Sequence, residues 1–88
     1  MCLNYIWVCD TTLLRMVLLN ESDLILAFGQ KVRLIRKGKK ISMQHLANLA
    51  EIEVSQIHRI ETGKINPKLT TILILAKALD INPSEFFK

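Results

Sequence analysis

This 88-residue chain has few residues that form disulfides or favour turns, with two cysteines, three glycines and two prolines. Aromatic residues are also scarce, at one Trp, one Tyr and three Phe, so Leu, Ile, Val and Ala must build most of the core. Half of the residues are hydrophobic, which is enough to make one compact domain plausible at this length. The composition therefore favours packed helices without disulfide or metal support.

The two cysteines, Cys2 and Cys9, do not match a zinc site, because they are seven residues apart and no further Cys or His lies close behind them. We interpret them as a reduced pair in a cytoplasmic protein. A secretion signal is not expected, since the N-terminus lacks a basic segment and Asp10 and Arg15 interrupt its apolar run. No run reaches the roughly eighteen apolar residues of a membrane span.

Catalytic patterns are missing from the sequence as well. It contains no nucleophile paired with a base, no phosphate-binding glycine loop and no cluster of metal-ligand residues. We interpret the two histidines, His45 and His58, as exposed polar residues. We therefore expect neither an enzyme nor a bound metal or cofactor.

Positive charge is concentrated in the middle of the chain. Residues 24–66 hold eight Lys or Arg against three Glu, a net charge of +5, whereas residues 1–23 carry a net charge of −2. Such a cluster can neutralise phosphates, or it can be a solvated surface, and charge alone does not decide between the two.

The N-terminal residues 1–21 form an apolar extension, and we expect the folded domain over residues 22–88. Residues 5–9 have the β-branched and aromatic content of a strand, while residues 13–19 fit a strand or a helix. Two interpretations stay open: the extension covers a partner surface, or Met16 is the natural start and the first fifteen residues are a misassigned upstream extension.

Residues 42–64 contain two short helical patterns separated by a four-residue break at 50–53. Ser42 caps the first pattern, Glu53 caps the second, and Gly63 ends the second, which extends to about Thr62. The apolar positions of this stretch are Leu46, Ala47, Ala50, Ile52, Ile57 and Ile60. Two short helices that meet at a steep angle, with the second offered outward, are the layout of a helix-turn-helix.

Three further helices complete the predicted all-α, five-helix bundle. The first is capped by Ser22 or Asp23 and ends near Lys37. Its buried face is predicted to hold Phe28, Val32 and Ile35, with Leu24 or Ile25 above them. The second covers residues 69–79, and its apolar stripe is predicted to hold Leu69, Ile72, Leu73, Leu75, Ala76 and Leu79. The last is a short helix with a start signal at Asn82, Pro83 and Glu85, followed by Phe86 and Phe87.

The outward side of the second motif helix carries groups suited to reading base edges in a DNA groove. The Arg59 guanidinium can donate two hydrogen bonds to guanine, at O6 and N7, and Ser55 and Gln56 can donate and accept hydrogen bonds. Val54, at the leading end, can touch a thymine methyl. Polar and basic groups on either side, including Lys40, can hold phosphates. The residues assigned to DNA contact are Ser42, Gln44, Val54, Ser55, Gln56, His58, Arg59, Thr62, Lys64 and Asn66.

From residue 24 to 87 the chain resembles the Cro and phage-repressor type of helix-turn-helix, the XRE family of five-helix DNA-binding domains. The matching residues are Arg36, the IS-x-x-x-LA run at 41–47, the I-x-RIE-x-GK run at 57–64, Asn66-Pro67, LAKAL at 75–79 and the closing NPSEFF at 82–87. The resemblance implies that the second motif helix enters the major groove and that dimers read a two-fold symmetric site. It also implies a structural ion pair between Arg36 and Glu61.

Three positions depart from the family pattern. Met43 stands where the family usually has a glutamine, so its hydrogen bond is lost and Gln44 can replace it only in part. Glu51 stands at the turn position usually held by glycine, where a positive φ costs on the order of 1 kcal/mol. The charges of Glu51 and Glu53 also lie near the expected DNA. We therefore expect weaker or more selective binding.

These features predict a transcriptional regulator, most simply a repressor, that binds double-stranded DNA as a homodimer. The alternative is a protein-interaction module, such as the antitoxin of a toxin–antitoxin pair, in which the apolar N-terminal residues contact the toxin. Both can hold at once.

Overall fold

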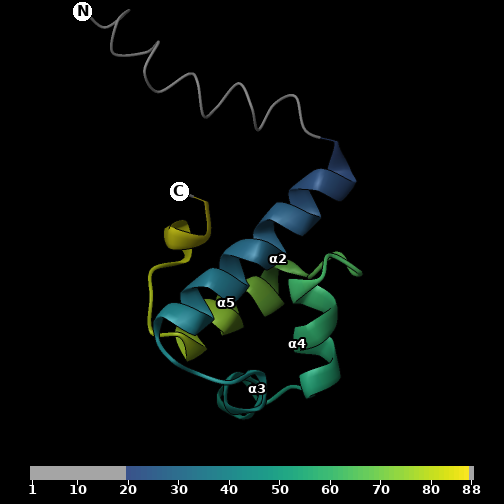
Figure 1. Cartoon of the computed structure of the whole chain (residues 1–88). Helices are drawn as coiled ribbons and strands as arrows, with labels where there is room; N and C mark the ends of the chain where they lie inside the picture. Colours follow the sequence, from purple (N-terminus) through teal and green to yellow (C-terminus); the bar gives the residue numbers. More distant parts are fainter. Residues whose placement is uncertain (1–19, 88) are drawn as a thin grey trace, which may run out of the picture.

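The computed structural model describes residues 20–87, and this part of the chain contains helices and turns but no strand (Figure 1). Its elements are α2 (Glu21–Gly38), α3 (Met43–Ala50), α4 (Val54–Glu61), α5 (Leu69–Ala78) and the 3-10 helix η1 (Pro83–Phe87). The prediction of an all-helical fold is confirmed, but the five-helix count needs correction, because the last element is a 3-10 helix. None of the described helices combines the length and the apolar character that crossing a bilayer requires.

The first described helix, α2, begins after Asn20, whose side-chain oxygen accepts a hydrogen bond from the Asp23 backbone N–H at 2.8 Å. The prediction of Ser22 or Asp23 as the cap is wrong, because Asn is an equally good cap and lies earlier in the chain. Glu21 and Asp23 instead occupy the first turn, where negative charge suits the helix dipole. The predictions for the N-terminal extension up to residue 19 lie outside the described residues.

The two helices of the motif begin where the sequence predicts. Ser42 precedes α3, and its hydroxyl oxygen accepts a hydrogen bond from the His45 backbone N–H at 3.0 Å. Glu53 precedes α4, but its side chain makes no capping hydrogen bond. The predicted end of α4 at Thr62 is one residue too late, because Thr62 already has non-helical backbone angles.

The closing segment confirms its start signal. The Asn82 side-chain oxygen accepts a hydrogen bond from the Ser84 backbone N–H at 3.0 Å, just before η1. This places Phe86 edge-on against Phe28 of α2, with ring centroids 5.1 Å apart. The segment η1 thus packs against both α2 and α5 and closes the helical core.

The core lies where α2 packs against α4 and where α3 packs against both α4 and α5. Its buried apolar side chains are Phe28, Val32, Leu46, Ala47, Ala50, Ile57, Ile60, Leu75, Ala76, Leu79 and Phe86. Ala47 is fully buried between the helices of the motif, as expected for a small residue at a close approach. All of the inward residues predicted for the two motif helices are buried.

Several residues predicted for the core are instead exposed. Leu69 and Leu73 of α5 are 70% and 45% exposed, so the predicted stripe on this helix was too wide. The reason is that α5 is apolar nearly all round, and helical spacing then cannot select one face. At the start of α2, the choice left open between Leu24 and Ile25 falls to Ile25, which is half-buried while Leu24 is exposed. In η1, Phe86 is buried and Phe87 is exposed.

Candidate nucleic-acid interface

The outer side of α4 is the centre of the candidate interface. Its inner side is fixed by Ile57, Ile60 and Glu61, which are all buried. Because 3.6 residues make one turn, this burial leaves Val54, Ser55, His58 and Arg59 exposed on the opposite side. Gln56 is only half-buried and lies at the border of the two sides. The structure therefore brings together four of the five predicted α4 contact residues on one exposed side.

The end of α4 is closed by a turn that sets the position of Lys64. The Gly63 backbone has a φ of 72°, a left-handed conformation that glycine adopts readily, as predicted for this helix end. The Lys64 backbone N–H then donates to the Arg59 carbonyl at 2.8 Å. Lys64 and Asn66 both emerge exposed from this turn, next to the last turn of α4.

Thr62, another predicted contact residue, is occupied within the protein. Its hydroxyl donates a hydrogen bond to the His58 carbonyl at 2.7 Å. A phosphate oxygen needs a donor, and this hydroxyl has already used its proton. The geometry therefore gives Thr62 a role in ending α4, and does not present it as a donor toward DNA.

The start of α3 forms the second polar edge of the interface. Ser42 caps the helix and is exposed, and its hydroxyl satisfies one of the N–H groups of the first turn. Gln44 is exposed, and its side-chain amide donates to the Asn48 side-chain oxygen at 2.9 Å, one turn further along α3. The sequence analysis missed this partner, although the i, i+4 spacing of the two amides is a signal for it.

A buried ion pair holds α2 against the end of α4. The Arg36 Nε lies 2.7 Å from the Glu61 carboxylate, and a second guanidinium nitrogen donates to the same carboxylate at 3.1 Å. The third guanidinium nitrogen donates to the Ile41 carbonyl at 2.8 Å, in the segment that leads into α3. The Arg36–Glu61 pair that the resemblance implies is therefore present, and it ties both edges of the interface to α2.

The turn between α3 and α4 carries negative charge. Glu51 has a φ of 58° and a ψ of 43°, the left-handed conformation expected where the family has glycine. This conformation directs the chain out of α3, and the Ile52 backbone N–H donates to the Ala47 carbonyl at 3.0 Å. Glu51 and Glu53 are both exposed. Acidic groups at this turn oppose a polyanion that lies over the start of α4.

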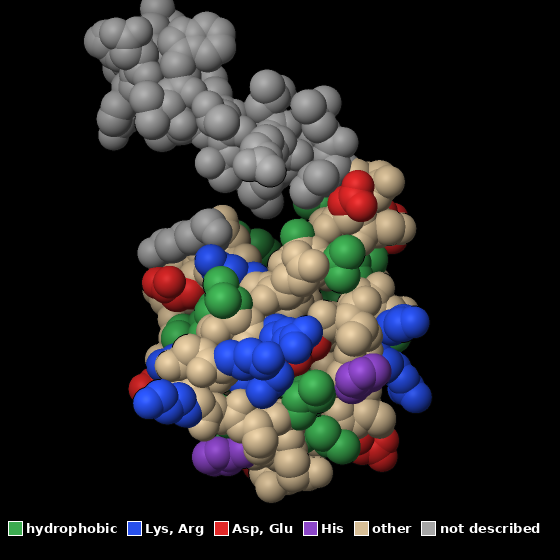
Figure 2. Space-filling view, viewed as in Figure 1, with side chains coloured by type: hydrophobic (Ala, Val, Ile, Leu, Met, Phe, Trp, Pro, Cys, Tyr) green, Lys and Arg blue, Asp and Glu red, His purple; other side chains and the backbone are tan. Residues whose placement is uncertain are grey.

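Basic side chains surround these elements. Figure 2 shows Lys and Arg side chains gathered near the middle of the face in view, with acidic side chains mostly toward its border. The last turn of α2 contributes Lys37, and the connection from α2 to α3 contributes Lys39 and Lys40, all of them exposed. Lys40 has a φ of 59°, so this residue just before the motif is left-handed, as Glu51 is. Exposed basic side chains therefore lie on the segment that leads into α3 and, at Lys64, after the end of α4.

Comparison with known proteins identifies the motif. The model of the helix-turn-helix family HTH_3 matches residues 32–86, which is more than half of the chain. The chain belongs to this helix-turn-helix family. Its members include regulators that act by binding double-stranded DNA, a non-enzymatic kind of protein, and the resemblance noted in the sequence is confirmed.

The relatives of this HTH_3 domain include transcriptional regulators and control proteins. The transcriptional repressor RghR of Bacillus subtilis is 39% identical over 56 residues, which cover 62% of this chain and 42% of the repressor. Control protein C.BamHI of Bacillus amyloliquefaciens is 37% identical over 65 residues, which cover 73% of this chain and 80% of that protein. The chain spans about two fifths of the length of the first curated relatives it matches.

The fold also matches a solved structure of the same kind. The restriction-modification controller protein C.AhdI from Aeromonas hydrophila has a TM-score of 0.70 and 43% sequence identity. The match covers 74% of this chain and 97% of the controller protein. Similarity over nearly the whole of that protein shows that the described helices form its type of helix-turn-helix domain.

Proposed function

We propose that this chain is a sequence-specific transcriptional regulator, a repressor that occupies a two-fold symmetric DNA operator as a homodimer. The observation that carries the proposal is the outer side of α4, where Arg59, Ser55, His58 and Val54 are all exposed. The Arg59 side chain forms no ion pair within the described residues, so its guanidinium is available to a ligand.

The proposed base contacts follow from the chemistry of these side chains. Arg59 can donate two hydrogen bonds to guanine O6 and N7, which is the commonest specific contact in the major groove. Ser55 can donate to or accept from either edge, and the Val54 methyl groups suit a thymine methyl. Gln56, which is half-buried, contributes from the border of the groove. A major groove of about 12 Å admits one α-helix, which fits α4 as the reading element.

The proposed phosphate contacts lie on either side of α4. Ser42 and Gln44 at the start of α3 hold one strand, assisted by the free N–H groups of the first helical turn. Lys64 and Asn66, after the end of α4, hold the other. Because these contacts carry no sequence information, they fix the register of α4 in the groove.

The acidic turn supports a selective regulator over a general DNA-binding protein. Glu51 and Glu53 are exposed at the end of α4 that enters the groove first, and each repels the phosphate backbone. Non-specific affinity depends on this electrostatic interaction more than specific affinity does. The two carboxylates therefore lower binding to random DNA and leave the base contacts to select the operator.

The experiment that tests this proposal is selection of bound sequences from a random DNA pool at a stated salt concentration. The proposal predicts enrichment of a two-fold symmetric sequence with half-sites about one helical turn apart. Enrichment of an asymmetric sequence would contradict the dimer. Failure to enrich any sequence, at a salt concentration where non-specific binding is weak, would contradict sequence-specific regulation itself.

A narrower proposal concerns the regulated genes. C.AhdI and C.BamHI are matched over 97% and 80% of their lengths, whereas RghR is matched over 42%. This pattern favours control of restriction–modification genes. The proposal predicts that the selected sequence occurs upstream of this protein's own gene and that a nuclease–methyltransferase pair lies next to it. If the selected sequence does not occur upstream of this gene, the narrower role is rejected, while the proposal of DNA-binding regulation still stands.

A further inference from the structure

An apolar hollow, which we call the α2 hollow, opens beside the first turns of α2. It has a volume of about 160 Å³ and lies between α2, the loop after α4, α5 and η1. All but one of the residues that line it are apolar, and two of them, Leu24 and Phe87, are 40% and 55% exposed. An apolar cavity of about 150 Å³ holds a benzene-sized group. The α2 hollow therefore has room for an apolar side chain that the described residues do not supply.

The start of α2 lies at the edge of this hollow. Asn20 caps the helix with extended backbone angles, and its side-chain oxygen accepts the hydrogen bond from the Asp23 backbone N–H. Because a cap residue is not helical, the helix ends here. Leu24 lies four residues after Asn20, about 6 Å along the helix axis. The segment that precedes Asn20 is therefore joined to the domain about one helical turn from the α2 hollow.

The sequence around this cap has the spacing of a hydrophobic staple. In a staple, the apolar residue directly before the cap packs against the apolar residue at the fourth helical position and fixes the angle at which the chain enters the helix. With Asn20 as the cap, these two positions are Leu19 and Leu24. Because Leu24 lines the α2 hollow, this contact directs the residues before Leu19 toward the hollow.

Residues 10–19 have the composition and the length that the α2 hollow requires. Six of the seven residues 13–19 are apolar, and Arg15 is the exception. A run of this kind gains free energy when it leaves water for an apolar surface. Ten extended residues reach up to about 33 Å. The segment is therefore long enough to extend from the cap across the hollow.

Charges on two sides of the α2 hollow match the charges of this segment in order. Glu21 and Asp23 lie at the start of α2, and Lys68 lies on the other side, where the loop after α4 meets α5. All three are exposed, and none forms an ion pair within the described residues. In the segment, Arg15 is the charge nearer to the cap and Asp10 is the farther one. A segment laid across the hollow thus brings each of its charges toward charges of opposite sign.

We infer that residues 10–19 bind in the α2 hollow of their own chain and complete the folded domain. The inference goes beyond the proposed regulator and does not depend on DNA binding. It also concerns the candidate interface, because Asn66, one of the side chains proposed for phosphate contact, is the polar residue of the lining. The bound segment therefore supports the loop that carries Lys64 and Asn66.

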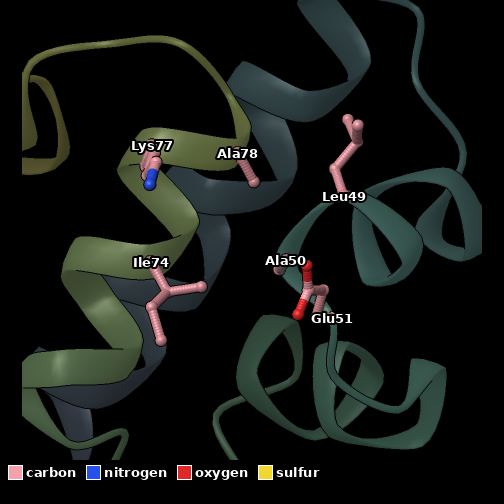
Figure 3. A pocket seen from close by; sticks show the side chains of 6 residues that line it. All are labelled: Leu49, Ala50, Glu51, Ile74, Lys77 and Ala78. Atoms are coloured by element: carbon pink, nitrogen blue, oxygen red, sulfur yellow. The ribbon is translucent and has the colours of Figure 1, made fainter.

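A second hollow provides the control. It has a volume of about 410 Å³ and lies between α3 and α5, with Leu49 and Ile74 on its two sides (Figure 3). None of the residues that line it belongs to α2. Its Leu49 is 49% exposed, which is close to the 40% of Leu24. These two leucines are therefore a matched pair that distinguishes binding in the α2 hollow from general attraction to apolar surface.

The test places a nitroxide label on Cys9 of the full chain and measures the broadening of backbone amide signals by magnetic resonance. Cys2→Ser leaves Cys9 as the single thiol, since the chain has two cysteines. The inference predicts that signals from the α2 hollow, including those of Ile72 and Phe87, broaden strongly, while signals from the second hollow broaden little. Weak broadening at both hollows, or stronger broadening at the second, would overturn the inference.

The matched substitutions test whether the α2 hollow itself holds the segment. Leu24→Gln replaces an exposed apolar side chain by a polar one that favours a helix about equally. It should reduce the broadening at Ile72 at least about twofold, because part of the hydrophobic driving force is lost. Leu49→Gln should leave the broadening unchanged, and circular dichroism checks that both variants keep their helical content. Equal effects of the two substitutions, or no effect of Leu24→Gln, would overturn the inference.

Charge reversal tests the direction in which the segment crosses the α2 hollow. Asp10→Lys and Lys68→Glu should each lower the docking equilibrium about two- to fivefold, because each places like charges opposite one another. The double variant should recover most of the loss. Asp10→Lys combined with Lys77→Glu, at the second hollow, should show no recovery. If both double variants behave alike, the proposed arrangement is overturned.

A mixed sample separates binding within one chain from binding between two chains. Isotope-labelled chains with both cysteines replaced by serine are mixed with nitroxide-labelled chains that carry no isotope. The inference predicts almost no broadening at Ile72 and Phe87 in this sample. Strong broadening there would mean that the segment binds a second copy, and the inference would be overturned. Since no DNA is present in these measurements, the reading role of Arg59 keeps its own test.

Discussion

Gly29 of α2 lies directly against the backbone carbonyl of Ile60 in α4. A Cβ atom added at Gly29 would clash with this oxygen and would also press on the Glu61 backbone at 3.1 Å. Only a residue without a side chain allows the two helices to approach so closely. This contact sets the distance between α2 and α4 and therefore the position of the proposed reading helix.

We predict that Gly29→Ala destabilises the domain by about 1–3 kcal/mol, since the helix backbones must move apart to admit the methyl group. Gly38→Ala is the matched control, because nothing lies within 4 Å of a Cβ at that position. It should be neutral or stabilise by up to about 1 kcal/mol. Urea unfolding of both variants measures the difference, and equal stabilities would show that the close approach is not required.

The buried pair of Arg36 and Glu61 gives a second prediction. Glu61→Ala should cost about 3–5 kcal/mol, because it leaves the buried guanidinium without its carboxylate. Replacing both partners by apolar residues, in Arg36→Met with Glu61→Leu, should recover more than half of this loss. Free energies of unfolding from urea titrations test this. A double variant as unstable as Glu61→Ala would mean that the hydrogen bond from Arg36 to the Ile41 carbonyl, and not the pair, holds α2 in place.

The left-handed turn residue gives a third prediction. Glu51→Gly should stabilise the domain by up to about 1 kcal/mol. A positive φ costs an L-residue about 1–2 kcal/mol, and glycine removes this strain. The gain is only partial, because glycine also increases the conformational entropy of the unfolded chain. It should also raise affinity for random DNA, since a carboxylate is lost. Glu51→Gln removes the charge and keeps the strained backbone. It should raise DNA affinity without raising the thermal unfolding midpoint, and a rise in both would contradict this separation.

The motif itself was predictable from sequence because each of its signals is local. Ser42 is a strong cap followed by spaced apolar residues, and these specify α3 with no long-range contact. The left-handed conformation of Glu51 was expected from its place in the family pattern, and the structure confirms it. Helix α4 has a single apolar stripe, so its outer side could be assigned directly.

The parts of the fold that the sequence did not predict depend on contacts between elements that are distant in the sequence. Gly29 stands inside a helix and carries no signal of its own, because its requirement comes from Ile60 in α4, thirty-one residues later. On α5 the apolar residues surround the helix, and only packing against α3 and η1 leaves Leu69 and Leu73 outside.

Within the candidate interface, residue type was predictable but availability was not. Thr62 was assigned to DNA contact from its position, yet its hydroxyl donates to the His58 carbonyl. Gln56 was assigned to the outer side and is half-buried. The helical period in a sequence assigns a residue to a helix face only to within about one position. The hydrogen-bond partners at a helix end can be identified only from the folded backbone.

The most direct test of the account is the effect of Arg59→Ala on binding to the selected operator and to unrelated DNA at the same salt concentration. Lys77→Ala, which removes the same charge from an exposed residue of α5, is the control. We predict that Arg59→Ala loses about 1–3 kcal/mol on the operator and much less on unrelated DNA, while Lys77→Ala changes both slightly. An equal loss on the two DNAs would contradict base reading by α4.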